Sequence, residues 1–93
     1  MTAQPLPREM IGQVVTLGGE EFEKDNGHTL GALLTEQSTD NLLGLRSLLT
    51  ETYAGDLAEV AADQINPMGH MVWWIVTVIE HEIGARWVGW SAG

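Results

Sequence analysis

The longest regular pattern of hydrophobic and polar positions runs from residue 28 to residue 53 and predicts an amphipathic helix. With each residue turned by about 100° from the last, four leucines fall within about 60° of one another on one side: Leu30, Leu34, Leu45 and Leu48. Three acidic residues fall on the opposite side: Glu36, Asp40 and Glu51. The segment therefore has one face for a core and one face for solvent.

Three polar residues, Gln37, Ser38 and Asn41, lie near the leucine stripe rather than on the solvent side. They have two interpretations. They mark a break or kink in the helix around 37–40, because short polar side chains compete for backbone hydrogen bonds. Alternatively, they line a polar pocket.

A short helix is predicted after the long one. Gly55 supplies a stop for the 28–53 helix, since glycine is the residue most often found just past a helix end. Asp56, with Glu59 three residues later, has the spacing of a capping box and predicts the start of the short helix.

Asn66 followed by Pro67 predicts the start of a last helix, which can run to about Trp87 or Trp90. Between residues 71 and 79 this helix is apolar on almost every side. One neighbouring helix covers one side only, so the rest of the apolar surface needs a second cover. The sequence therefore predicts a homodimer in which two copies pair into a four-helix bundle, with the tryptophans in the core or the interface.

The first segment, residues 8–24, has apolar residues at near-helical spacing, but Gly18 and Gly19 interrupt it. Residues 13–17 fit a short strand equally well, and residues 25–27 predict a turn. The pattern assigns no single structure to this part of the chain.

Together these elements predict one small all-α domain over residues 1–93. Its architecture is a helical hairpin of two long helices plus a short helix, contained in residues 28–93. Residues 1–27 form an N-terminal segment without an assigned structure.

The composition limits the function. The chain has 93 residues, no cysteine and a formal net charge of −9, so a metal site would have to use histidines and carboxylates. Strong acidity disfavours nucleic acid and anionic membrane surfaces as partners. Residues 1–10 lack the apolar run of a signal peptide, and the longest apolar run, 71–79, is about half a membrane span. A cytoplasmic protein is expected.

The stretch GHMVWWIVTVIEHEIGAR, at 69–86, follows a long amphipathic helix and an acidic connection. It resembles the second half of the DinB/YfiT-like bundle proteins, whose final helix carries the pattern H-E-x-H-H-R. His81, Glu82, Ile83 and Arg86 carry the resemblance. It implies an up-down helical bundle, often dimeric. The group includes metal-dependent, thiol-using transferases and isomerases that act on small molecules.

The resemblance also implies a metal site that is incomplete here. In the family, three histidines hold a divalent metal, one from an earlier helix and two spaced four residues apart on the last helix. His81 matches the first of that pair, but the second position is Ala85, whose methyl group cannot coordinate a metal. The sequence HEIGA is also one residue short of the H-E-x-x-H motif of metalloproteases.

A second copy could restore part of the site. His70 precedes His81 by eleven residues, so the two are about 20° apart around the helix and about 16 Å apart along it. If two copies of this helix packed antiparallel about Ile75 and Val76, His70 of one chain would approach His81 of the other. Such a site could hold zinc, nickel or manganese.

A possible small-molecule pocket on the last helix is expected to be lined by Trp73, Trp74, Thr77, His81 and Glu82. Glu82 and Arg86, four residues apart, also predict a surface ion pair. No complete catalytic group is present. The sequence predicts a dimeric DinB-like protein with a small-molecule-binding or structural role and a degenerate metal site. The alternative is a divalent-metal-dependent transferase or isomerase with a site completed across the dimer.

Overall fold

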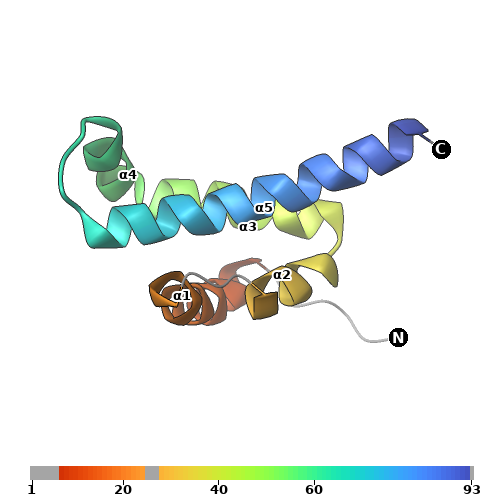
Figure 1. Ribbon diagram of the computed structural model, residues 1–93, viewed down its shortest axis with the longest axis horizontal. Coiled ribbons are helices and arrows are strands. Elements are labelled where there is room, and N and C mark those ends of the chain that lie inside the picture. The colour runs from red at the N-terminus through yellow and green to blue at the C-terminus, as the bar shows by residue number, and fades with distance from the viewer. Residues whose placement is uncertain (1–6, 25–27, 93) are drawn as a thin grey trace.

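The computed structural model describes residues 7–24 and 28–92, and every regular element in these ranges is a helix (Figure 1). The five helices are α1 (Pro7–Glu23), α2 (His28–Thr35), α3 (Thr39–Thr52), α4 (Ala54–Ala61) and α5 (Pro67–Ala92). The predicted all-α class is confirmed. The predicted turn at 25–27 and the side chain of Trp90 lie outside the described part of the structure.

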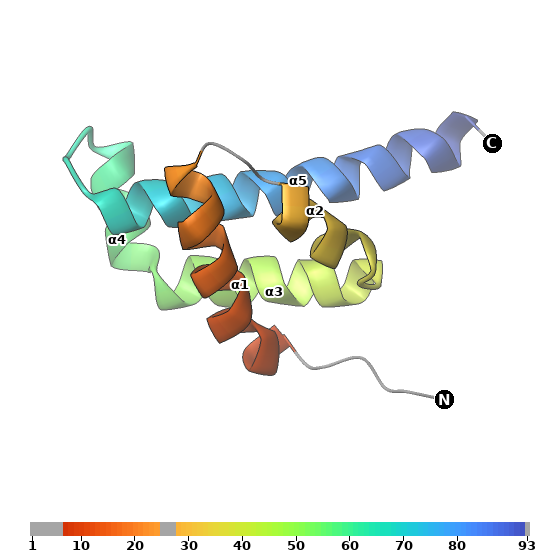
Figure 2. The ribbon, with the colours of Figure 1, turned by 60° about the horizontal axis from the view of Figure 1, so that its bottom comes forward.

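The helices form two layers (Figure 1). One layer contains α3 and α5, which lie side by side and antiparallel, while α1 crosses both of them (Figure 2). The second layer contains α1 and α2, and α4 packs against the start of α5. Both views show the last turns of α5 projecting beyond α2 and α3. One side of α5 is thus covered by four helices of its own chain, and the other side faces outward.

The core lies between the two layers and draws on four helices. Its buried side chains are Met10 and Val14 from α1, Leu30 and Leu34 from α2, Leu42, Leu45 and Leu49 from α3, and Val72, Ile75, Val76, Ile79 and Ile83 from α5. Of the predicted leucine stripe, only Leu48 is half-buried rather than buried. The three acidic residues predicted for the opposite side are exposed. The periodicity thus identified the core face correctly.

The predicted 28–53 helix is broken into α2 and α3. The polar residues near the leucine stripe make the break: the Ser38 hydroxyl accepts the N–H of Asn41 and caps α3. The Asn41 amide donates to Oε1 of Gln37 at 3.0 Å, which satisfies a buried side chain. Of the two interpretations of these residues, the structure shows the break.

The first segment is a helix rather than a strand, and its two glycines mark a helix crossing. Gly18 is buried where α1 meets α5, and a Cβ there would overlap the Ile75 side chain, with Cγ1 only 2.6 Å away. A Cβ on Gly19 would lie 3.1 Å from the sulfur of Met71. The pair therefore lets two helix backbones approach closely and does not interrupt the helix.

Glu21 joins α1 to α2. Its side chain is only 5% exposed, and its carboxylate accepts the backbone N–H groups of Thr29, at 2.7 Å, and Leu30, at 3.0 and 3.1 Å. These N–H groups belong to the first turn of α2 and have no partner within that helix. A buried negative charge at the positive end of a helix is favourable. The carboxylate thus takes the place of a local N-cap.

The predicted start of the short helix is wrong. α4 begins at Ala54, so Gly55 and Asp56 lie inside its first turn rather than at a stop and a cap. The Asp56 carboxylate instead accepts from the side-chain amide of Asn66 at 2.9 Å. Only one residue, Tyr53, separates α3 from α4, and the N–H of Leu57 donates to its carbonyl at 2.9 Å. Because of this tight junction the N-cap of α4 is Tyr53, three residues before the predicted N-cap Asp56.

The predicted start of α5 is confirmed. Pro67 is its first residue, and Oδ1 of Asn66 accepts the N–H of Gly69 at 2.9 Å. The same amide also donates to Glu59 at 3.0 Å, which binds the end of α4 to the start of α5.

Gly69 marks a second close approach, and we expect the variant Gly69→Ala to be destabilised by about 1–2 kcal/mol. A Cβ at this position would lie 2.6 Å from the carbonyl oxygen of Asp56 and 2.7 Å from Cγ2 of Val60. Backbone atoms cannot rotate away, so α4 and α5 must separate. The gain in helix propensity, at most about 1 kcal/mol, offsets only part of this.

Urea unfolding followed by circular dichroism measures the effect, and Gly12→Ala is the matched control. Gly12 is also helical, but a Cβ there meets nothing within 4 Å. The control should therefore be stabilised by about 0.5–1 kcal/mol. Equal responses of the two variants would contradict the close packing of α4 on α5.

Candidate functional site

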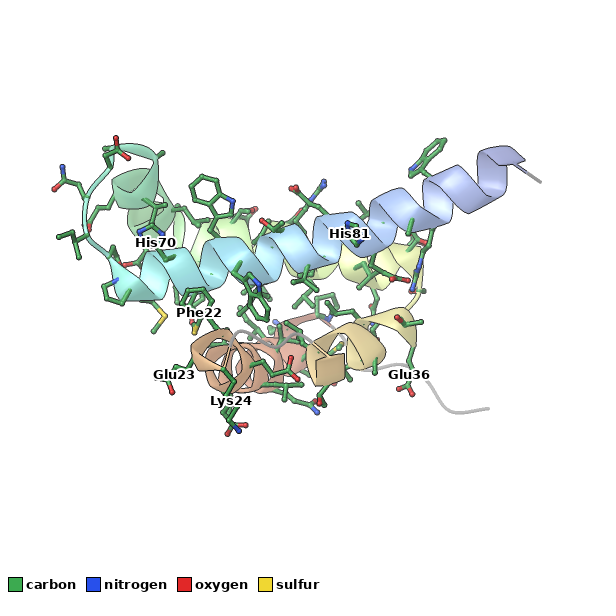
Figure 3. The ribbon with its side chains drawn as sticks, in the orientation of Figure 1. Phe22, Glu23, Lys24, Glu36, His70 and His81 are labelled. Atoms are coloured by element: carbon green, nitrogen blue, oxygen red, sulfur yellow. The ribbon has the colours of Figure 1, made fainter. Side chains whose placement is uncertain are left out.

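The structure does not bring the predicted metal residues together within one chain. His70 and His81 are both exposed on α5 (Figure 3). Their spacing in the helix puts them about 16 Å apart, too far to share an ion. Within residues 7–24 and 28–92, no three histidine or carboxylate side chains form a group that could hold a metal. Ala85, at the position of the missing family ligand, is exposed.

The residues of α5 that could contact a second copy are not the ones that the sequence suggested. Ile75 and Val76 are buried in their own core, so they cannot contact a second chain. Trp73 and Thr77 are exposed at the same level of α5. Packing of two copies at this level would therefore use these side chains.

The predicted small-molecule pocket is divided between different sides of α5. Trp74 is half-buried and its ring lies 5.8 Å from that of Phe22 on α1. Trp73 is 50% exposed on another side, and the Thr77 hydroxyl donates to the Trp73 carbonyl at 2.9 Å. Only His81 and Glu82 remain together. They line a cavity of about 370 Å³ between α2 and α5, with Gly31, Ala32, Leu34, Thr35 and Val78.

Glu82 and Arg86 form the predicted ion pair, with 3.0 Å between Oε1 and Nε. The guanidinium also makes three hydrogen bonds to α2 and α3. Its Nη2 donates to the carbonyls of Leu34, at 3.3 Å, and Thr35, at 3.1 Å, and its Nη1 donates to the Thr39 hydroxyl, at 3.1 Å. Arg86 therefore caps the end of α2 and holds the start of α3. In this chain the arginine that matches the family pattern has a structural role.

The outer face of α5 is the side of the helix that the other helices of the chain leave uncovered. We define it by its exposed residues His70, Trp73, Thr77, Glu80, His81, Gly84, Ala85 and Trp87. Trp73 and Trp87 are 50% and 60% exposed, far more than large apolar side chains usually are. Beside Trp87, a cleft of about 410 Å³ runs between α3 and α5 and is lined by Thr39, Leu43, Ile83, Arg86 and Trp87.

The outer face of α5 is also almost free of charge. The chain carries 13 acidic residues, but Glu80 is the one ionic side chain in this set. Its carboxylate lies 4.0 Å from the guanidinium of Arg46 on α3, a contact that partly offsets its charge. The negative charge of the molecule is therefore concentrated on other surfaces.

No family model, curated protein or solved structure matches this chain. The resemblance to the DinB/YfiT-like proteins thus depends on the residues of the last helix named above. No helix within the described residues is both long and apolar enough to cross a membrane.

Proposed function

We propose that the protein acts as a homodimer in which the outer faces of two α5 helices pair, and that its role is structural or the binding of a small molecule. The observation that carries this proposal is the exposure of Trp73 and Trp87 on one helix. A tryptophan can bury about 150–250 Å². Covering the exposed part of each indole would contribute roughly 2–3 kcal/mol before the cost of association.

The distribution of charge supports the same contact. Two chains with a net charge of −9 each repel one another, so a contact between acidic surfaces would be unfavourable. The outer face of α5 offers Glu80 as its one carboxylate, next to Arg46. It is therefore a surface on which two copies can meet with little repulsion. The resemblance to a family of frequently dimeric helical bundles agrees with this.

Replacing Trp73 and Trp87 together by glutamine is expected to weaken self-association at least about 30-fold, because interface tryptophans commonly contribute 2 kcal/mol or more. Sedimentation velocity over a range of concentrations measures this. Both side chains are half exposed or more, so their loss should leave the fold and its circular dichroism spectrum unchanged.

Met68→Gln is the control for this variant. Met68 is also an exposed apolar residue of α5, 44% exposed, but lies near the start of the helix and outside the outer face. The control should dimerise like the unmodified chain. A monomer at every concentration, or an unchanged dimer in the double tryptophan variant, would rule out the proposed contact.

A metal-dependent transferase or isomerase is the second candidate, because His70 and His81 are both exposed on the outer face of α5. Antiparallel pairing would bring His70 of one copy toward His81 of the other. Under this hypothesis zinc, nickel or manganese raises the melting temperature by several degrees, and His81→Ala abolishes the rise. Metal-free protein with an unchanged melting temperature after metal addition would exclude it.

A further inference from the structure

A second surface, away from the outer face of α5, has the features of a ligand site. A groove of about 740 Å³ lies between the second half of α1 and the first turns of α5. Its apolar lining includes Val15, Phe22, Met68 and Met71. Phe22 and Met68 are 37% and 44% exposed, so the groove is open to solvent. The volume is within the usual range for small-molecule sites, about 300–1,000 Å³.

The chemistry of the groove favours an apolar ligand. Methionine is flexible and polarisable, so two methionines can adapt to ligands of different shape. Phe22 extends from α1 toward α5 (Figure 3), where its ring packs 5.8 Å from that of Trp74. The side chain is thus held by a neighbour while part of it remains accessible. The groove lining thus combines one aromatic ring with two thioethers.

The edge of the groove is negatively charged. Glu20 and Glu23 belong to the lining, both are exposed, and no lysine or arginine is among the lining residues. Lys24 follows directly and is exposed, but it is not among the residues that line the groove. The whole chain carries a net charge of −9, which strengthens the attraction of a cation to this edge. Phe22 adds an electron-rich ring face, which also favours positive charge.

We propose that this groove binds a hydrophobic organic cation, with its apolar part on Phe22, Met68 and Met71 and its charge near Glu20 and Glu23. The proposal makes the small-molecule-binding role specific, and it rests on that half of the proposed function. It needs no second copy of the chain, because the groove lies outside the outer face of α5.

Two probes of nearly identical shape and opposite charge test the proposal: tetraphenylphosphonium and tetraphenylborate. Calorimetric titration should give one phosphonium bound per chain with a micromolar Kd, and a Kd for the borate that is at least about tenfold weaker. In two-dimensional NMR spectra, the backbone amides of Gly19, Met68 and Met71 should shift with the phosphonium. Absence of binding, or equal binding of both ions, would overturn the proposal.

Two pairs of substitutions separate the groove from general charge attraction. Glu20→Gln with Glu23→Gln removes two charges from the groove edge and should weaken phosphonium binding about five- to tenfold. Glu9→Gln with Glu51→Gln makes the same change in net charge at two exposed positions outside the groove and should weaken it less than about twofold. Equal weakening by the two pairs would show that the cation is attracted by net charge alone.

Two further variants distinguish an error in the proposed groove site from an error in the proposed dimer. Met68→Gln should weaken phosphonium binding severalfold and leave the oligomeric state unchanged. The double glutamine variant of Trp73 and Trp87 should show the reverse. If Met68→Gln binds the cation normally, the groove is not the site, and the proposed pairing of α5 is unaffected.

Discussion

Replacing Arg86 with alanine is expected to lower the free energy of unfolding by about 2–4 kcal/mol, the largest effect of any single substitution considered for this protein. The guanidinium donates to two carbonyls at the end of α2, to Thr39 on α3 and to Glu82 on its own helix. Without it the carbonyls of Leu34 and Thr35 lose these donors and Glu82 loses its ion pair. The side chain is 25% exposed, so water can replace only some of these bonds.

Chemical denaturation followed by circular dichroism measures this loss, and lysine at the same position tests the geometry. Lysine keeps the charge but has one nitrogen where arginine has a rigid fork of three, so Arg86→Lys should recover less than half of the loss. The control is Arg46→Ala. Arg46 makes a 4.0 Å surface contact with Glu80, and its removal should cost less than about 1 kcal/mol. Similar losses in Arg46→Ala and Arg86→Ala would contradict the capping role of Arg86.

Glu21→Ala is expected to be nearly as destabilising, by about 2–3 kcal/mol, because it removes the acceptor of the N–H groups of Thr29 and Leu30. The N–H of Leu30 is buried, so water cannot readily replace the carboxylate. Amide hydrogen exchange gives a local measure: Leu30 should lose protection more than the centre of α3 does.

Two variants serve as controls for this prediction: Glu21→Gln, and Glu20→Ala at the preceding residue. Glu21→Gln keeps an acceptor oxygen but loses the charge, so its loss should be intermediate. Glu20→Ala removes an exposed carboxylate one residue earlier and should change stability by less than about 0.5 kcal/mol. If Glu20→Ala and Glu21→Ala unfold at the same denaturant concentration, the carboxylate does not hold α2 in place.

Features that depend on neighbouring residues could be predicted from the sequence. The leucine stripe identified the core side of α2 and α3, and Asn66 with Pro67 located the start of α5. The ion pair of Glu82 and Arg86 also followed from spacing on one helix. In each case the interacting groups are within one or two helical turns, where geometry is fixed by the helix itself.

Features that depend on distant residues could not be predicted. Arg86 lies 47 to 52 residues from its partners on α2 and α3, and no local pattern encodes those contacts. Gly18 suggests an interrupted helix when only its neighbours in the sequence are considered. Its structural role, which is to let α1 pack closely on α5, depends on Ile75. Asp56 and Glu59 have the spacing of a capping box, but Asp56 does not cap α4. The helix already starts after Tyr53, and the Asp56 carboxylate accepts a hydrogen bond from Asn66.

The candidate site shows the same division. Trp73 and Trp74 are adjacent, so they point about 100° apart on a helix, and the sequence does not say which of the two faces α1. The structure places Trp74 beside Phe22 and leaves Trp73 half exposed. The groove at Met68 and Met71 was not predicted either, because Phe22, Glu20 and Glu23 reach it from a different helix.

The crossing of α1 over α3 and α5 also has a consequence for biosynthesis. Met10 and Val14 are translated before α5, yet the buried cluster to which they belong includes side chains of α5. The apolar surface of α1 is therefore fully covered only after α5 has left the ribosome. Until then the nascent chain exposes part of α1, and we expect the core to close only once α5 has emerged.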